Sequence, residues 1–329
     1  MVIFFAVFLL TLLVLTAVAI VRTKNLFVAV MLSGIFSLLM AANFFILDAA
    51  DVALTEAAVG AGITTVLFLG ALALTAEHEQ AVPAGRWVSI SVVVLTTLVL
   101  IYATFDKPRL GDPDAPVHQH VAPWYLEKTP ELIDIPNVVT AVLASFRGYD
   151  TLGEVFVVFT ACIGVLFILG ARSGEHSSVS TSSPPRKTQG LRHHLIPRVV
   201  GRLLIPFIVL FGLYVQFHGE YGPGGGFQAG AIIAAGIILY ALLEGETQAM
   251  SAVPRSALLG LLVGGTMLYG AMGIAGIAFG GNFLDYSVLL KNSVSGQQLG
   301  ILLIEVGVGM TVCGALLLIF YAFAAREYR

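Results

Sequence analysis

Nine long apolar segments run through this chain, and they constrain its fold more than any other feature. A helix rises about 1.5 Å per residue, so about 20 apolar residues cross the hydrocarbon layer of a membrane. Crossings are expected near residues 2–21, 25–47, 52–76, 87–104, 151–171, 199–217, 227–243, 256–279 and 298–324. The sequence therefore predicts an all-α integral membrane protein with about nine transmembrane helices.

The composition supports a chain that faces lipid. Hydrophobic residues make up 57% of the 329 positions and charged residues only 11%, against about 25% charged in soluble domains. The net charge is −3 without a basic stripe, so no nucleic-acid partner is expected. Cys162 and Cys313 lie in apolar runs, which disfavours a disulfide framework or a thiolate metal site. We expect neither a metal nor a cofactor.

The distribution of basic residues predicts the orientation. Of the 17 Lys and Arg residues, eleven fall on one side of the predicted membrane and five on the other, and Arg202 lies within a span. Positive charge is retained in the cytoplasm, so the N-terminus is predicted outside and the C-terminus in the cytoplasm. The first crossing is followed by Arg22 and Lys24 and not by a cleavage site, so it is expected to remain in the mature protein.

Two long connections divide the chain. Residues 105–150 form an outer loop that ends in an amphipathic stretch, and residues 172–196 have the Ser- and Pro-rich composition of a cytoplasmic linker. The amphipathic stretch predicts a short helix on the membrane surface or on a partner. Its apolar residues, at helical spacing, are Val138, Val139, Val142, Leu143 and Phe146.

Three crossings carry a lone glutamate: Glu56, Glu154 and Glu305. A charge within a bilayer costs at least about 2.5 kcal/mol, so each residue needs a reason to be there. One interpretation is structural, in which the glutamate caps a helix, pairs with another subunit or is protonated against a backbone carbonyl. The other is functional, in which these carboxylates, with Asp51 and Asp150 nearby, bind cations or relay protons.

The run from His218 to Gly230 lies between the sixth and seventh crossings. Pro223 followed by Gly224, Gly225 and Gly226 forces a sharp turn, and Phe227 and Gln228 then open the next helix. A tight outer hairpin is one interpretation, and a cation entrance lined by His218 and Glu220 is the other. The predicted spans carry no central Lys or His, so a complete ion path would need partner subunits.

These motifs resemble three subunits of known membrane complexes. The run Asp51–Gly62 with residues 64–69 is similar to the C-terminal region of the A subunit of Mrp-type multisubunit Na+/H+ antiporters, and to the D subunit of archaeal membrane-bound hydrogenases. Residues 146–154 resemble the E-type subunit of the same complexes. The Pro-Gly-Gly-Gly-Phe-Gln run at 223–228 resembles the signature of the Mrp B subunit.

The resemblance implies three fused units and a function. Residues 1–80 would form a three-helix unit and residues 81–171 a two-helix unit, followed by the linker and a four-helix unit at 197–329. The chain would be one component, without chemistry of its own, of a complex in the bacterial cytoplasmic membrane that exchanges Na+ for H+. Its partners would be the large antiporter-like subunits and the small membrane subunits of that complex.

Two points stay open. The A-subunit pattern commonly has an acidic residue where Gly60 stands and Gln at the position of Glu56, which leaves the role of Glu56 undecided. The second point is the kind of complex. The chain could instead serve the ion-translocating membrane arm of a hydrogenase or a complex I-like redox enzyme, and a self-sufficient carrier or a structural scaffold is a third interpretation.

Overall fold

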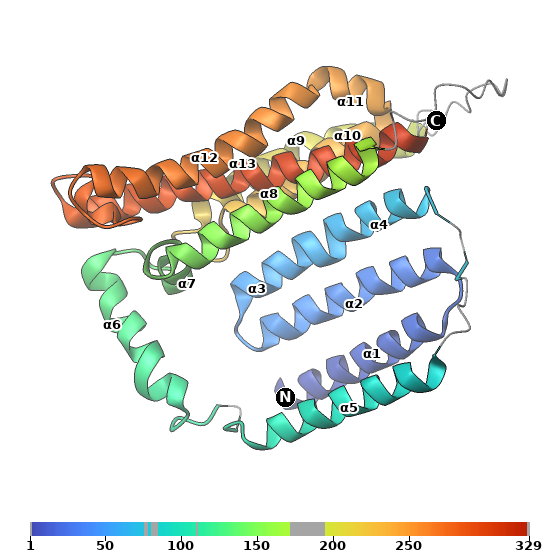
Figure 1. Cartoon of the computed structure of the whole chain (residues 1–329), viewed down its shortest axis with the longest axis horizontal. Coiled ribbons are helices and arrows are strands. Elements are labelled where there is room, and N and C mark those ends of the chain that lie inside the picture. Colours follow the sequence, from blue (N-terminus) through green and yellow to red (C-terminus); the bar gives the residue numbers. More distant parts are fainter. Residues whose placement is uncertain (1, 76–77, 80–84, 110, 172–194, 328–329) are drawn as a thin grey trace.

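The structure is a computed structural model that describes residues 2–75, 78–79, 85–109, 111–171 and 195–327 (Figure 1). Within these ranges the chain is almost entirely helical and forms no strand, and nine helices are long and apolar enough to cross a membrane. This confirms the predicted all-α membrane fold. The predicted linker lies outside the described residues apart from its last two positions, which begin α9.

The helices follow one another with short connections. In chain order they are α1 (Val2–Arg22), α2 (Leu26–Ile46), α3 (Ala50–Thr55), the π-helical η1 (Glu56–Ile63), α4 (Thr64–Leu72), α5 (Arg86–Phe105), the π-helical η2 (Val117–Val121), α6 (Ala122–Leu132), α7 (Val138–Ala141), the π-helical η3 (Val142–Phe146), α8 (Gly148–Ala171), α9 (Leu195–His218), α10 (Gly226–Glu244), α11 (Glu246–Ala252), α12 (Arg255–Ala278), η5 (Tyr286–Val288) and α13 (Ser293–Glu327). The third crossing is the continuous run of α3, η1 and α4.

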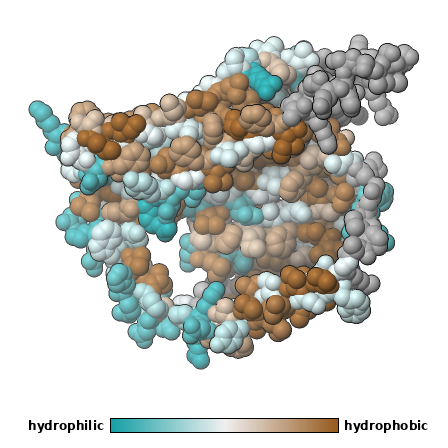
Figure 2. All heavy atoms as spheres, viewed as in Figure 1, coloured by the Kyte–Doolittle hydropathy of each residue, from teal (hydrophilic) through white to brown (hydrophobic). Residues whose placement is uncertain are grey.

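The long helix α13 organises the molecule. It packs against α12, α10 and α8, and α4 contacts it from the layer formed by α1, α2 and α3–α4. Figure 1 shows this layer beside the bundle of α8 to α13. Burial is greatest in α13 and α10, whereas only 6% of the residues in the apolar spans of α1 and α2 are buried. Figure 2 shows hydrophobic residues over much of the visible sides of the bundle and hydrophilic residues gathered around α6.

Glycines permit the close approach of α10 and α13. A side chain on Gly226 would overlap the carbonyl oxygen of Glu305, and a methyl group on Gly230 would lie 2.6 Å from the carbonyl oxygen of Gly309. Small residues let transmembrane helices approach until their backbones touch, which is the main source of attraction between helices in lipid. The first turn of α10 is thereby placed directly against the middle of α13.

The amphipathic stretch differs from its prediction. It is helical as expected, in α7 and η3, but it packs within this chain and not only on a membrane surface or a partner. Its buried face is formed by the small residues Ala141 and Ala144, while Val139 and Leu143 stay exposed. Small residues on that face allow the helix to approach α13 closely, so the apolar periodicity identified the helix but not its buried side.

A single methyl group tests the contact between α10 and α13. We expect Gly230→Ala to destabilise the protein by about 1–3 kcal/mol, because overpacking forces the two backbones apart. Gly260→Ala is the matched control, since no heavy atom lies within 4 Å of a methyl group there. Thermal unfolding of the purified protein in detergent, followed by size-exclusion chromatography, should show a lower midpoint for Gly230→Ala alone. Equal midpoints would contradict the close contact.

Candidate functional site

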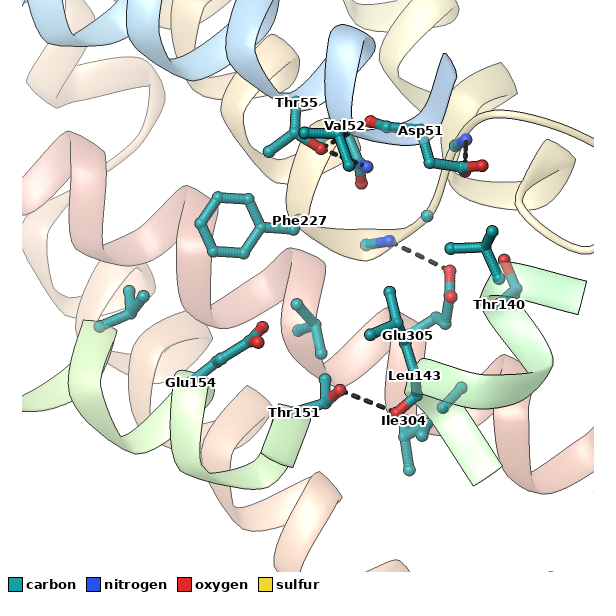
Figure 3. Close-up of a pocket in the computed structure, with 18 of the residues that line it drawn as sticks. Asp51, Val52, Thr55, Thr140, Leu143, Thr151, Glu154, Phe227, Ile304 and Glu305 are labelled. Carbon is teal, nitrogen blue, oxygen red and sulfur yellow. Dashed lines mark hydrogen bonds between the residues drawn. The ribbon is translucent and has the colours of Figure 1, made fainter. Parts of the chain in front are cut away.

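A cavity of about 570 Å³ lies where α3, α7, α8, α10 and α13 meet (Figure 3). Its walls are mostly apolar, formed by residues such as Val52, Leu143 and Val158. The polar side chains that line it are Asp51, Thr55, Thr140, Thr151, Glu154, Gln228 and Glu305. Three of these are carboxylates, and each comes from a different part of the chain.

Glu305 lies on α13 and closes the N-terminus of α10. Its Oε2 accepts a hydrogen bond of 3.1 Å from the backbone N–H of Gly226, the first residue of α10. Helix N-termini carry unpaired N–H groups and a partial positive charge, so a carboxylate is stabilised there. Gly225, the residue just before the helix, has a φ of 124° that favours glycine, which explains why the Gly-rich run is required at this contact.

Asp51 belongs to the first turn of α3 and faces the Gly-rich loop. Its Oδ1 accepts hydrogen bonds from the backbone N–H of Gly224 at 3.4 Å and from the side-chain amide of Asn137 at 3.3 Å. One turn further along, Thr55 Oγ1 accepts a hydrogen bond of 2.7 Å from Gln228 Nε2. These contacts join α3 to the loop and to the start of α10.

Glu154 enters the cavity from α8. Figure 3 shows its carboxylate and that of Glu305 pointing into the space between the helices, while Asp51 lies on the side of α3. The neighbouring Thr151 donates a hydrogen bond of 2.8 Å to the carbonyl oxygen of Leu143, which ties the start of α8 to η3. Glu154 lines the cavity and is exposed at the surface of this chain.

The structure separates Glu56 from the cavity. Five residues along a helix correspond to a rotation of about 140°, so Glu56 points away from the face that carries Asp51. Its carboxyl carbon lies 2.9 Å from the place that a methyl group on Gly60 would take, and Ser37 Oγ of α2 is 2.9 Å from the same point. Glu56 therefore lies between its own helix and α2, at the start of the π-helical segment.

The other predicted ion-path residues do not line the cavity, whereas most of the predicted turn does: Gly224, Gly225, Gly226, Phe227 and Gln228. Asp150 forms an ion pair with Arg147 in an exposed position, and His218 stacks on Tyr214 with ring centroids 4.8 Å apart. Glu220 lies in the loop between α9 and α10, where burial raises the pKa of its carboxyl. Within the described residues no group of three or more potential metal ligands forms.

Sequence reasoning missed an ion network around a buried glutamate at the other end of α10. Glu244, only 2% exposed, ends α10 and accepts hydrogen bonds from Arg198 Nε and Nη2 at 3.1 Å each and from Arg202 Nε. The pairing explains how an arginine is accommodated within a crossing. Arg202 was visible in the sequence as a charge within a span, but its partner lies 42 residues away.

Comparisons with known families match three successive parts of the chain. Residues 11–77 match the MbhD family, the D subunit of MBH, and residues 86–186 match the MbhE family, the E subunit of MBH. Residues 196–318 match a domain related to the MnhB subunit of Na+/H+ antiporter. A protein of Staphylococcus haemolyticus (strain JCSC1435) named as antiporter subunit mnhB2 is 30% identical over 132 residues, which cover 37% of this chain and 93% of that protein.

A solved structure covers nearly the whole chain. The structure of the Mrp complex from Dietzia sp. DQ12-45-1b contains a chain that is 28% identical, with a TM-score of 0.75, covering 96% of this chain and 34% of that one. This chain belongs to the family of Mrp-type antiporter subunits. The predicted division of the chain into units at 1–80, 81–171 and 197–329 stays a proposal, because the matches identify families and not folding units.

One longer relative aligns with most of the chain. A protein of Rhizobium meliloti (strain 1021), named as the A/B subunit of a probable K(+)/H(+) antiporter, is 27% identical over 92% of this Mrp-type chain and 32% of its own length. The Mrp-type chain thus spans about a third of this relative and of the Dietzia chain. A chain of the membrane-bound sulfane sulfur reductase, an archaeal respiratory membrane complex, is 30% identical with a TM-score of 0.50, covering 69% of this chain and 96% of that one.

The three cavity carboxylates come one from each matched part. Asp51 lies in the range that matches MbhD, Glu154 in the range that matches MbhE, and Glu305 in the MnhB-related range. The cavity is therefore formed at the junction of the three parts of this Mrp-type chain and not inside any one of them.

Two substitutions distinguish the contribution of the hydrogen bond at Glu305 from the contribution of its negative charge. Glu305→Gln keeps an oxygen that accepts from the Gly226 N–H, so we expect a stability close to that of the wild type. Glu305→Ala leaves that N–H without a partner and should cost about 1–3 kcal/mol. Thermal unfolding in detergent measures both variants, and an equal loss in the two would show that the charge, and not the hydrogen bond, stabilises this helix end.

Proposed function

We propose that this chain is a membrane subunit of a multisubunit monovalent cation/proton antiporter in the bacterial cytoplasmic membrane. In this proposal it contributes part of the ion path and part of the subunit interface, and it performs no covalent chemistry. The supporting observation is the mostly apolar cavity that Asp51, Glu154 and Glu305 line together. Structural neighbours and relatives named as antiporter subunits agree with this assignment.

The chemistry of exchange follows from the cost of a bare carboxylate. In a medium of low dielectric constant an isolated ionised carboxylate is expensive, so it either takes up a proton or holds a cation. A carboxylate that binds either a proton or a cation, but not both at once, makes the proton and the cation compete for the site. The nearby hydroxyl of Thr55 and the amide of Gln228 supply further oxygen atoms of the kind that hard cations prefer.

The path requires partner subunits for its completion. No Lys or His lies at the centre of a span within the described residues, so the cavity carboxylates have no basic neighbour there for a relay. In α5 none of the residues of its apolar span is buried within the described part of the chain, which leaves this helix to lipid or to other subunits. We therefore assign the remainder of the path to large antiporter-like subunits and small membrane subunits.

Neutral variants of the cavity carboxylates test the ion path. We expect Glu154→Gln and Glu305→Gln to lower cation-dependent proton exchange by about tenfold or more, because an amide neither carries a proton nor balances a cation in a low dielectric medium. The measurement is proton release from everted membrane vesicles on addition of Na+ or K+, followed with a pH-sensitive dye. Glu56→Gln, tested alongside, shows whether the path extends to the space between α2 and η1.

The control for these variants is Glu131→Gln. Glu131 pairs with Lys128 on the exposed surface of α6, outside the cavity, so its loss should leave exchange unchanged. Native gel electrophoresis checks that each complex is assembled. Normal exchange in both cavity variants, with the complex intact, would remove the ion-path assignment and favour a scaffold.

The second candidate is the membrane arm of a redox-driven pump, which the similarity to a chain of a respiratory sulfane sulfur reductase favours. The two candidates predict different partners. We expect a C-terminally tagged chain, extracted from native membranes in mild detergent, to co-purify with large antiporter-like subunits and without redox subunits. Mass spectrometry of the complex gives the answer, and iron–sulfur subunits in stoichiometric amounts would establish the redox assignment instead.

A further inference from the structure

One amide joins the three parts of the chain at the edge of the cavity. Asn137, 9% exposed, precedes α7 in the range that matches MbhE. Its Nδ2 lies 3.0 Å from the carbonyl oxygen of Gly219, 2.9 Å from that of Gly222 and 3.3 Å from Asp51 Oδ1. The two glycines belong to the MnhB-related part and Asp51 to the part that matches MbhD.

The oxygen of the same amide is used as well. Asn137 Oδ1 accepts from the backbone N–H groups of Val139 at 3.0 Å and Thr140 at 3.4 Å, so it forms the N-cap of α7. The hydroxyl of Thr140 donates to the Gly219 carbonyl oxygen at 2.7 Å, and the backbone N–H of Asn137 donates to the carbonyl oxygen of Glu220 at 3.0 Å. The start of α7 is thus bound to the Gly-rich loop through both side chain and backbone.

The contact between Asn137 and the Gly-rich loop is sensitive to substitution, because the side-chain amide has fewer N–H donors than acceptors around it. A carboxamide nitrogen carries two hydrogens, and here three acceptors surround it, two of them carbonyls of the Gly-rich loop. Removal of the N–H groups leaves these oxygens without that donor, and a charged oxygen in their place would repel Asp51. The position of the loop relative to α3 therefore depends on the N–H groups of the Asn137 side chain.

We propose that Asn137 is a positioning residue that fixes the rim of the cavity, defined here as Asp51 together with the loop at 219–225. The rim sets the position of the Asp51 carboxylate and of the Gly224 and Gly225 backbone, both of which line the cavity. The effect on transport rests on the proposed ion path, whereas the effect on the loop does not. Asn137 itself does not line the cavity, so it acts through these groups.

Asn137→Asp separates the two functions of the side chain. Aspartate caps a helix as well as asparagine does, so α7 keeps its start, but the donor is replaced by a charge that faces Asp51. Asn137→Ser is the second variant, because serine also caps a helix and introduces no charge. Asn25→Asp is the matched control, because the Asn25 side chain caps α2 by accepting from the Val28 N–H, the one hydrogen bond that it forms with the described part of the chain.

The first readout is the mobility of the loop. Tyr221 is 67% exposed, so a ketone-bearing phenylalanine analogue placed there can carry a nitroxide without the use of cysteines. In the purified complex we expect the electron paramagnetic resonance spectrum to sharpen in Asn137→Asp and in Asn137→Ser, and to stay unchanged in Asn25→Asp. An unchanged spectrum in both Asn137 variants would overturn the positioning role.

The second readout is transport by the same complexes. A displaced rim should raise the cation concentration for half-maximal exchange by about tenfold, the effect of losing one hydrogen bond to a charged group. The maximal rate should stay within about twofold, because the carboxylates that carry the ion are intact. A more mobile loop combined with unaltered cation dependence would support the positioning role and contradict the cavity as part of the ion path.

Discussion

The close approach of α10 to α13 is the contact on which the rest of the structure depends. Gly226 and Gly230 let the two backbones meet, and the carboxylate of Glu305 can then reach the first N–H of α10. A larger residue at either glycine would move the start of α10, and with it the Gly-rich loop at 219–225 that α3 and α7 contact. Because lipid offers no hydrophobic driving force between helices, such backbone contact is what holds these two helices together.

Structural and functional explanations of Glu305 are therefore compatible. The hydrogen bond from Gly226 and the partial charge of the helix end make a carboxylate tolerable at this depth, without a fixed counter-ion. A group held in this way stays accessible from the cavity, where a proton or a cation can reach it. The arrangement at Glu244 is different, because two arginines pair with that carboxylate and act as fixed counter-ions.

The sequence alone predicted the nine crossings and the sharp turn at 223–226, because hydrophobic length and glycine–proline chemistry are local properties. It did not separate Asp51 from Glu56, since both are acidic residues near one helix end and only their rotation about the axis distinguishes them. The carboxyl of Glu56 lies over Gly60, so it occupies the region where an acidic side chain at residue 60 would begin. Asn137 and Glu244 were missed because their partners lie more than 40 residues away, beyond any local pattern.

The cavity also explains what is gained when the three parts share one chain. The contacts of Asn137 with Asp51 and Gly219 then form within a single polypeptide, so the rim assembles without a bimolecular step. One side of the molecule remains uncovered, because no residue in the apolar span of α5 is buried within the described part of the chain. The parts that must hold a carboxylate in a defined position are thus fixed internally, and the surface left open is the one through which partner subunits can contact the chain.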